Sequence, residues 1–188
     1  AALASEYGDP LNIGKLCALA GFLHDMGKFT VHFSDYLRSV VLKKEAIRPH
    51  IDHSTAGAKY LYERYWSNQP QDAIRSYVVE IAGMAILSHH SGLHNFLSID
   101  GRVNDYIRRT VEKELPHYEE VVQNFQSIEG NVERVDRLVD EATEELAAFF
   151  EKVKHQTMER GSQRTALSTV SYLQKLVFSI LVDADRTE

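Results

Sequence analysis

The sequence predicts an all-α protein on the strength of three observations. Proline is scarce, with four in 188 residues, and alternating segments typical of β-strands are nearly absent. Apolar residues recur instead at intervals of three and four along most of the chain, which is the period of a helix with one buried face. With 44% hydrophobic and 26% charged residues, the composition is that of a globular domain whose length suffices for a core. We therefore expect a compact multi-helix bundle.

The apolar period places the individual helices. It predicts helices at residues 11–26, 31–44, 53–66, 71–88 and 103–114. After a polar segment at 116–125, a long amphipathic helix is expected from residue 131 to about 156, with a charged solvent-facing side. Gly161 and Ser162 are expected to separate it from a final helix. Since the chain shows no linker, internal repeat or low-complexity tract, we expect residues 1–188 to form a single domain.

Composition also bears on the compartment. The single cysteine, Cys17, excludes an internal disulfide and fits a reducing cytoplasm. It lies in the first apolar helix, so we expect it to be buried and inert. No stretch approaches the roughly 20 uncharged apolar residues of a membrane span, and the first residues lack the pattern of a signal peptide. A cytoplasmic location without membrane contact is the expectation.

The first chemical signal is the pair His24 and Asp25 in the segment GFLHDMGK. Leu16, Cys17 and Ala20 precede His24 by eight, seven and four residues, so His24 continues their buried face. Asp25 is rotated by only about 100° from it. A carboxylate so close to a core needs a metal ion or a cation such as Lys28. The alternative is a helix end at which Asp25 simply faces solvent.

Further histidines recur where helices are expected to begin or end. His53 lies at the start of a helix that Asp52 or Ser54 can cap. His89 and His90 end the apolar segment at 76–90, and both rings are predicted to point inward. One inward histidine is usually a hydrogen-bonded core residue, whereas three of them together with a His-Asp pair are difficult to explain as core residues alone.

The last helix supplies a carboxylate. Leu176, Val177 and Ile180 precede Asp183 by seven, six and three residues, which predicts that Asp183 lies on the buried stripe. Asp185 falls about 200° further round the helix. It is expected to face solvent, or to hydrogen-bond a metal ligand without binding the metal itself. The alternative for Asp183 is a frayed helix end, since five residues follow it.

These residues and their neighbours resemble the HD superfamily of metal-dependent phosphohydrolases. Within it, the chain resembles the HD nuclease domain of the CRISPR-associated nuclease-helicase of type I systems. The resemblance spans residues 2–185 and is carried by LHDMGK at 23–28, DHSTAGA at 52–58, HHSGL at 89–93 and LVDAD at 181–185. One departure is FSDYL at 33–37, where the family has FQ-x-YL. The family pattern also has a histidine on a helix upstream of Ala1, outside the sequence given.

The resemblance implies two metal ions bridged by Asp25. One ion would be held by His24, Asp25 and Asp183, and the other by Asp25, His53, His89 and His90. Without the upstream histidine, the first ion is expected to bind more weakly. Imidazoles and carboxylates suit Mn, Fe, Co, Ni or Zn better than Mg, which prefers oxygen ligands.

The resemblance also implies roles around the metals. Lys28 matches the family lysine that contacts a phosphate or the attacking water. Ser54 is expected to contact substrate. Ser91 and His94, in the loop after His90, are expected to contact substrate or to hydrogen-bond a metal ligand, although a loop histidine such as His94 is more often simply exposed.

The function implied by the resemblance is metal-dependent cleavage of single-stranded DNA, by an endonuclease or exonuclease mode, in the antiviral defence of a prokaryotic cytoplasm. The expected partners are a helicase module and a crRNA-guided surveillance complex. No GK[ST] phosphate loop occurs, so we expect the helicase module to lie outside this chain.

The net charge of −6 predicts weak DNA binding by the chain alone. Two basic clusters could line a strand path, or be ordinary solvated faces: Arg38, Lys43, Lys44 and Arg48, and Arg102, Arg108 and Arg109.

Two other functions stay open. One is an HD-type nucleotide phosphohydrolase, either a dNTPase or a cyclic-nucleotide phosphodiesterase. The other is a non-catalytic helical module that keeps its metals for structure.

Overall fold

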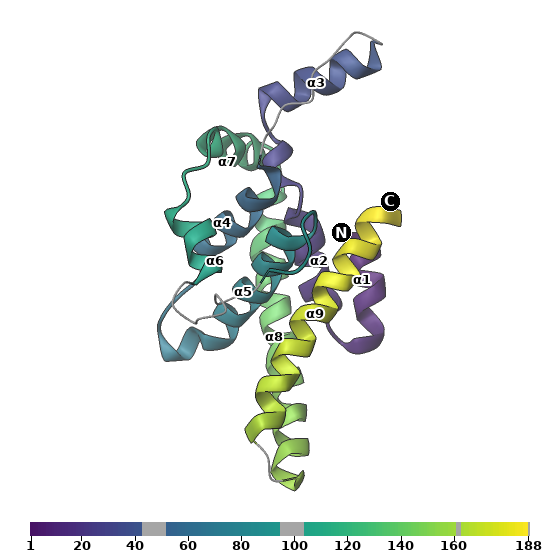
Figure 1. Cartoon of the computed structure of the whole chain (residues 1–188), viewed down its shortest axis with the longest axis vertical. Helices are drawn as coiled ribbons and strands as arrows, with labels where there is room; N and C mark the ends of the chain where they lie inside the picture. Colours follow the sequence, from purple (N-terminus) through teal and green to yellow (C-terminus); the bar gives the residue numbers. More distant parts are fainter. Residues whose placement is uncertain (43–51, 95–103, 161–162, 188) are drawn as a thin grey trace.

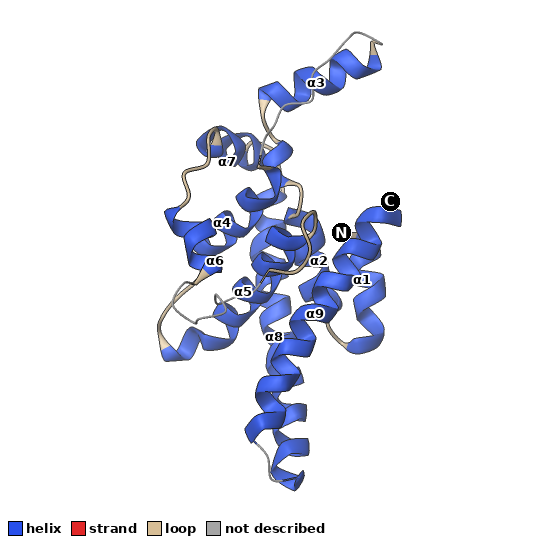
Figure 2. Ribbon diagram, viewed as in Figure 1, coloured by secondary structure: helices blue, strands red, loops and turns tan. Residues whose placement is uncertain are grey.

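The computed structural model describes residues 1–42, 52–94, 104–160 and 163–187, without the side chains of His53 and of residues 156–160 and 163–168. Within these ranges the regular structure is helical throughout, and Figure 2 shows no strand in the described part. The all-α prediction is confirmed. None of the described helices combines the length and apolar character that crossing a bilayer requires.

The described helices follow the predicted order, with differences at their ends. Their bounds are α1 Ala2–Gly8, α2 Gly14–Leu23, α3 Val31–Val41, α4 His53–Tyr65, α5 Ala73–Ser88, α6 Asp105–Ile107, α7 Tyr118–Gln126, α8 Asn131–Arg160 and α9 Gln163–Thr187. Short 3-10 segments lie at Asp9–Leu11, Met26–Lys28 and Pro70–Asp72, and α6 continues as a π-helical turn at Arg108–Glu112. Helix α1 was not predicted. The expected break at Gly161 and Ser162 falls outside the described residues.

The predicted helix at 11–26 is shorter in the structure because the backbone interrupts it at both ends. Asn12 adopts a left-handed conformation with φ of 56°, so α2 begins only at Gly14. At the other end, α2 stops at Leu23 and the chain turns through Asp25 into the 3-10 segment. His24 and Asp25 therefore lie at a helix C-terminus, where backbone carbonyls lack intrahelical partners.

Helix α2 lies at the centre of the bundle and contacts α1, α5, α8 and α9 (Figure 1). Leu19 and Leu23 are fully buried, and so is Cys17, as predicted. A carboxylate from α8 holds the beginning of α2: the backbone N–H groups of Lys15 and Leu16 both donate to Glu145 Oε2 at 3.0 Å. These are orphan donors of a helix N-terminus, where a negative charge is stabilising. Helix α8 thus fixes the helix that leads to His24.

Helix α4 crosses the end of α2 at very short range. A Cβ atom on Gly57 would lie 2.2 Å from the carbonyl oxygen of Leu23, so only glycine fits there. The predicted cap is also confirmed, since Asp52 accepts hydrogen bonds from Thr55 N at 3.1 Å and from Thr55 Oγ1 at 2.8 Å. The start of α4 is therefore held close to the turn that carries His24.

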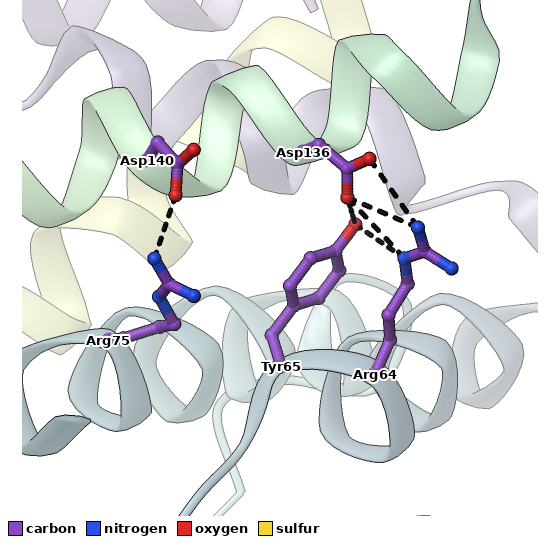
Figure 3. A network of polar contacts seen from close by, with 5 residues as sticks. All are labelled: Arg64, Tyr65, Arg75, Asp136 and Asp140. Atoms are coloured by element: carbon purple, nitrogen blue, oxygen red, sulfur yellow. Dashed lines mark hydrogen bonds and ion pairs between the residues drawn. The ribbon is translucent and has the colours of Figure 1, made fainter.

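Helix α8 is the long amphipathic helix that the sequence predicts. Its stripe of Val135, Leu138, Val139, Ala142 and Leu146 is buried. Its polar side binds the end of α4 and the start of α5, as Figure 3 shows: Tyr65 Oη donates to Asp136 at 2.6 Å, Arg64 pairs with the same carboxylate at 3.3 Å, and Arg75 pairs with Asp140 at 2.9 Å. Such exposed pairs contribute little individually, but together they orient the α4–α5 connection on α8.

Candidate metal centre

Three helix ends meet at one place in the bundle. His24 and Asp25 follow α2, His89 and His90 follow α5, and Asp185 lies in the last turn of α9. His24 Nε2 is 3.1 Å from Asp185 Oδ1, and the ring centroids of His24 and His89 are 5.1 Å apart. The rings of His89 and His90 lie 3.9 Å apart. Residues from three distant segments therefore form one cluster of imidazoles and carboxylates.

Backbone carbonyls fix how two of the imidazoles point. His24 Nδ1 donates to the carbonyl oxygen of Gly21 at 3.0 Å, and His89 Nδ1 donates to that of Ile86 at 2.6 Å. Each acceptor lies three residues earlier, in the last turn of the preceding helix, where carbonyls need partners. With the hydrogen on Nδ1, a neutral ring presents the lone pair of Nε2. That is the arrangement in which a histidine binds a metal while its other nitrogen is anchored.

The contact between His24 and Asp185 carries a chemical consequence. If His24 is neutral with its hydrogen on Nδ1, an Nε2 lone pair and a carboxylate oxygen face each other at 3.1 Å, and two acceptors repel. Either a second proton converts His24 to an imidazolium that donates to Asp185, or a cation lies between the two atoms. Both solutions place a positive charge at this point.

Asp25 offers a second such position. Its Oδ2 accepts a hydrogen bond from Lys28 Nζ at 2.5 Å and lies 3.3 Å from His24 Nε2. Its Oδ1 is buried and has no hydrogen-bond partner among the described residues. A buried carboxylate oxygen without a partner is costly, so a cation there would be stabilising. Although burial opposes ionisation, His24 and Lys28 hold the pKa of Asp25 well below its usual range, and the carboxylate is charged at neutral pH.

The two anchored histidines differ in their affinity for protons. Burial lowers the pKa of His89 to about 4, so this ring is neutral at pH 7 and its lone pair is available. Burial also acts to lower the pKa of His24, but the carboxylates of Asp25 and Asp185 and the Gly21 carbonyl outweigh it and raise that pKa above 6.5. Metal and proton compete for His24, so metal affinity should fall at acidic pH.

Two groups of ligand atoms are placed to hold metal ions. One consists of His24, His89 and Asp185, and the other of Asp25, His89 and His90. Within each group, one ligand atom per residue lies within 4.8 Å of the others. Nitrogen and carboxylate oxygen donors in this mixture suit divalent first-row transition metals. The side chains present therefore fit the metals that the sequence predicts.

On α9 the structure brings Asp185, and not Asp183, next to His24. Asp183 is exposed, and the prediction that it faces inward is wrong. The buried stripe consists of Leu173, Val177, Ile180, Leu181 and Ala184, whereas Leu176, which the prediction counted as buried, is 37% exposed. On this corrected stripe, Asp183 and Asp185 lie about 100° from its centre on opposite sides. Only the side of Asp185 faces His24.

The structure also differs from the prediction in how His89 and His90 are placed. His90, which was expected to point inward, is exposed, although its ring lies against that of His89. His89 belongs to both ligand groups rather than to one. The side chain of His53 lies outside the described part, so its role as a ligand stays a prediction.

The three expected substrate contacts are engaged with other protein groups. Ser54 Oγ donates to Asp52 Oδ1 at 3.2 Å. Ser91 Oγ lies 2.7 Å from His94 Nε2, and the Arg109 guanidinium lies 2.6 Å from the same nitrogen. Burial and the positive charge of Arg109 lower the pKa of His94. The role of these groups toward a substrate stays a prediction, and residues 43, 44, 48 and 102 of the basic clusters lie outside the described residues.

In the comparison with known families, one family model matches nearly the whole chain. The sequence model of the family described as "Cas3, HD domain" matches residues 3–186. Neither the curated proteins nor the solved structures gave a match. The matched range includes every residue of the cluster at the three helix ends.

Proposed function

Because the chain belongs to the Cas3 HD domain family, the HD domains of the nuclease-helicases of type I CRISPR systems, we propose that it cleaves single-stranded DNA with divalent metal ions. The observation that carries this proposal is the convergence of His24, Asp25, His89 and Asp185. Their nitrogen and oxygen ligand atoms lie close together. Backbone carbonyl groups hold the rings of His24 and His89 in place, and Lys28 holds the carboxylate of Asp25.

The proposed ligand set follows the geometry. His24 and Asp185 hold one ion, and Asp25, His89 and His90 hold the other, with His53 retained as a further ligand of the second ion. His89 also lies within reach of the first ion, but its single free Nε2 lone pair can bind only one ion. Asp185 takes the place that the sequence gave to Asp183. When bound, divalent ions supply positive charge for the transition-state oxygens and make a coordinated water acidic at neutral pH. Mn, Fe, Co, Ni or Zn fits these donors better than Mg does.

The protein groups have separate tasks in this proposal. Gly21 and Ile86 keep the rings of His24 and His89 oriented through their carbonyl oxygens. Lys28 balances the charge of Asp25 at 2.5 Å. Once a cation takes over that balance, the ammonium group is available to donate to a phosphate oxygen, which is a strong charge-assisted hydrogen bond. Lys28 then orients the phosphodiester beside the metal ligands.

The partners belong to the same proposal. With a net charge of −6, the chain offers little electrostatic attraction to DNA. A helicase module, acting with a crRNA-guided surveillance complex in antiviral defence in the prokaryotic cytoplasm, would deliver the strand in single-stranded form. This accounts for a nuclease domain whose own net charge is negative.

One experiment separates the candidate functions. The purified chain, loaded with Mn²⁺ or Ni²⁺, is incubated with single-stranded DNA, duplex DNA and a panel of deoxynucleotides and cyclic nucleotides. We expect cleavage of the single strand, resistance of the duplex, and loss of activity with chelator. Hydrolysis of a nucleotide with intact single strands would instead show a nucleotide phosphohydrolase, and metal binding without any hydrolysis would show a structural metal module.

A further inference from the structure

Helix α3 stands clear of the rest of the molecule, as Figure 1 shows. No residue of α3 is buried. Two aromatic side chains, Phe33 and Tyr36, lie near its first turns with ring centroids 5.9 Å apart and planes inclined at 47°. Among the described residues, neither ring is part of the apolar core or packs against it. Half-buried aromatic rings that do not support the core are available for another contact.

The base of α3 is nevertheless fixed to the bundle by hydrogen bonds. Thr30 Oγ1 accepts from Phe33 N at 3.1 Å and caps the helix. Two residues of α7 hold the same junction: Glu120 Oε1 accepts from Val31 N at 2.7 Å, and Asn124 Nδ2 donates to the carbonyl oxygen of Phe29 at 3.0 Å. The aromatic pair therefore has a defined position relative to the bundle.

That position is next to the metal ligands. Lys28 Nζ lies 2.5 Å from Asp25 Oδ2 and 5.8 Å from the centroid of the Phe33 ring. Each of Asp25, Lys28, Phe33 and Tyr36 is thus a neighbour of the next. A strand whose phosphate lies at Lys28 would bring its neighbouring bases to the aromatic pair.

We propose that Phe33 and Tyr36 form a stacking platform for the unpaired bases next to the cleaved phosphodiester. The inference rests on the proposed nuclease function and names what that site recognises. Aromatic rings bind the faces of bases without reading their sequence, and only bases released from a duplex expose those faces. The platform would therefore give the site a preference for single strands.

The charges of α3 favour stacking over electrostatic attraction. Its only described ion pair joins Asp35 to Arg38 at 3.3 Å, which leaves little net charge on that part of the helix. The aliphatic residues further along, Leu37, Val40 and Val41, are 48%, 49% and 79% exposed but cannot stack on bases. A base platform is thus confined to the end of α3 nearest Lys28, whereas a protein partner would use the aliphatic end.

The test compares Tyr36→Ala and Phe33→Ala with Tyr36→Phe, which keeps the stacking ring, and with Val40→Ala, a matched change on the same helix. Binding of a fluorescent oligothymidylate to chelated protein is measured by anisotropy at several low salt concentrations. Chelation keeps the strand intact and isolates stacking from metal charge. Each alanine at an aromatic position should weaken binding about 5- to 100-fold, while Tyr36→Phe and Val40→Ala should stay within twofold.

Two further readouts sharpen the result. The salt dependence should have the same slope in Tyr36→Ala as in the unsubstituted protein, because the slope counts phosphate contacts rather than stacking. An oligonucleotide with abasic sites should bind the unsubstituted protein as weakly as the intact strand binds Tyr36→Ala. Circular dichroism of each variant checks that the helices are retained.

The proposal is overturned if the unsubstituted protein does not bind the strand, or if the aromatic variants bind as tightly as it does. It is also overturned if Val40→Ala loses as much affinity, which would show that the loss comes from altering the helix and not from removing a ring. Cleavage of the same strand by the Mn²⁺-loaded unsubstituted protein is measured in parallel. Cleavage with unchanged binding in the variants would reject the platform alone. Loss of binding in the aromatic variants without any cleavage by the unsubstituted protein would reject the nuclease and keep the platform.

Discussion

The choice between Asp183 and Asp185 gives the sharpest test of the proposed metal centre. Replacing either residue by asparagine removes one negative charge from the same end of α9 and preserves the shape of the side chain. Asp185 Oδ1 lies 3.1 Å from His24 Nε2, whereas Asp183 is exposed on the other edge of the buried stripe. Asp185→Asn should therefore weaken metal binding, and Asp183→Asn should not.

The size of the effect follows from the contact. Residues that only support a metal ligand typically contribute 10- to 100-fold to metal affinity. A carboxylate that itself faces the ion should contribute at least about 100-fold, or about 3 kcal/mol. In Asp185→Asn, the amide can donate to His24 Nε2 and occupy the lone pair that the metal needs. Water or a buffer anion that takes the place of the missing carboxylate should therefore not restore metal affinity.

The assay is calorimetric titration of Mn²⁺ into chelator-treated protein, with the strand-cleavage rate measured on the same samples. We expect the ion beside His24 and Asp185 to be lost in Asp185→Asn, while Asp183→Asn stays within twofold of the unsubstituted protein. A second readout needs no metal. Since Asp185 helps to raise the pKa of His24, that pKa, followed by NMR, should fall in Asp185→Asn only. Metal loss in Asp183→Asn with normal binding in Asp185→Asn would refute the reasoning.

Other changes test other contacts. Asp25→Ala should lower metal content and reduce strand cleavage more than 100-fold, and metal analysis showing two bound ions with near-normal cleavage would contradict its role. Gly57→Ala should cost about 2–4 kcal/mol in thermal unfolding because its Cβ would meet the Leu23 carbonyl oxygen at 2.2 Å; a stability gain from better helix propensity would be the opposite outcome. Burial acts to raise the pKa of Asp52, but Lys113 and Thr55 outweigh this effect and lower that pKa from 3.8 to about 2. Ionised Asp52 therefore stabilises the fold above pH 3.8, and this stabilisation is lost as the pH falls through 2. After discounting for solvent screening, urea unfolding should show Asp52→Asn to be less stable than the unsubstituted protein by about 1 kcal/mol at pH 7. The difference should be about half of that at pH 3. Cys17 is buried with its pKa raised to about 12, so native protein should react with a thiol reagent only as fast as it unfolds.

The helices could be predicted from the sequence because each long one buries a single face. The stripe of α8 at Val135, Leu138, Val139 and Ala142 is a clear example of the helical period. Helix ends were harder, since the left-handed turn at Asn12 leaves no apolar signature. Helix α1 escaped prediction because it has only seven residues, too few for the period to show.

The candidate site could be located but not resolved to its atoms. His24 and His89 were recognisable because each follows a buried helical face by one turn, and a helix end supplies the carbonyl that anchors the ring. The acids on α9 were different. Both Asp183 and Asp185 flank the buried stripe, and which edge meets α2 depends on how two helices pack, which the period of one helix does not contain.

The directions of the helices explain why the cluster attracts cations. Helices α2, α5 and α9 all bring their C-terminal ends to it, and each such end carries about half a negative charge. Asp25 and Asp185 add two further negative charges, and among the described side chains that pair with them, Lys28 is the fixed positive one. A phosphodiester at this end of the bundle would therefore bind less tightly without metal. Divalent ions reverse the sign of the local charge, so added metal should strengthen strand binding beyond the affinity that the aromatic pair supplies in chelated protein.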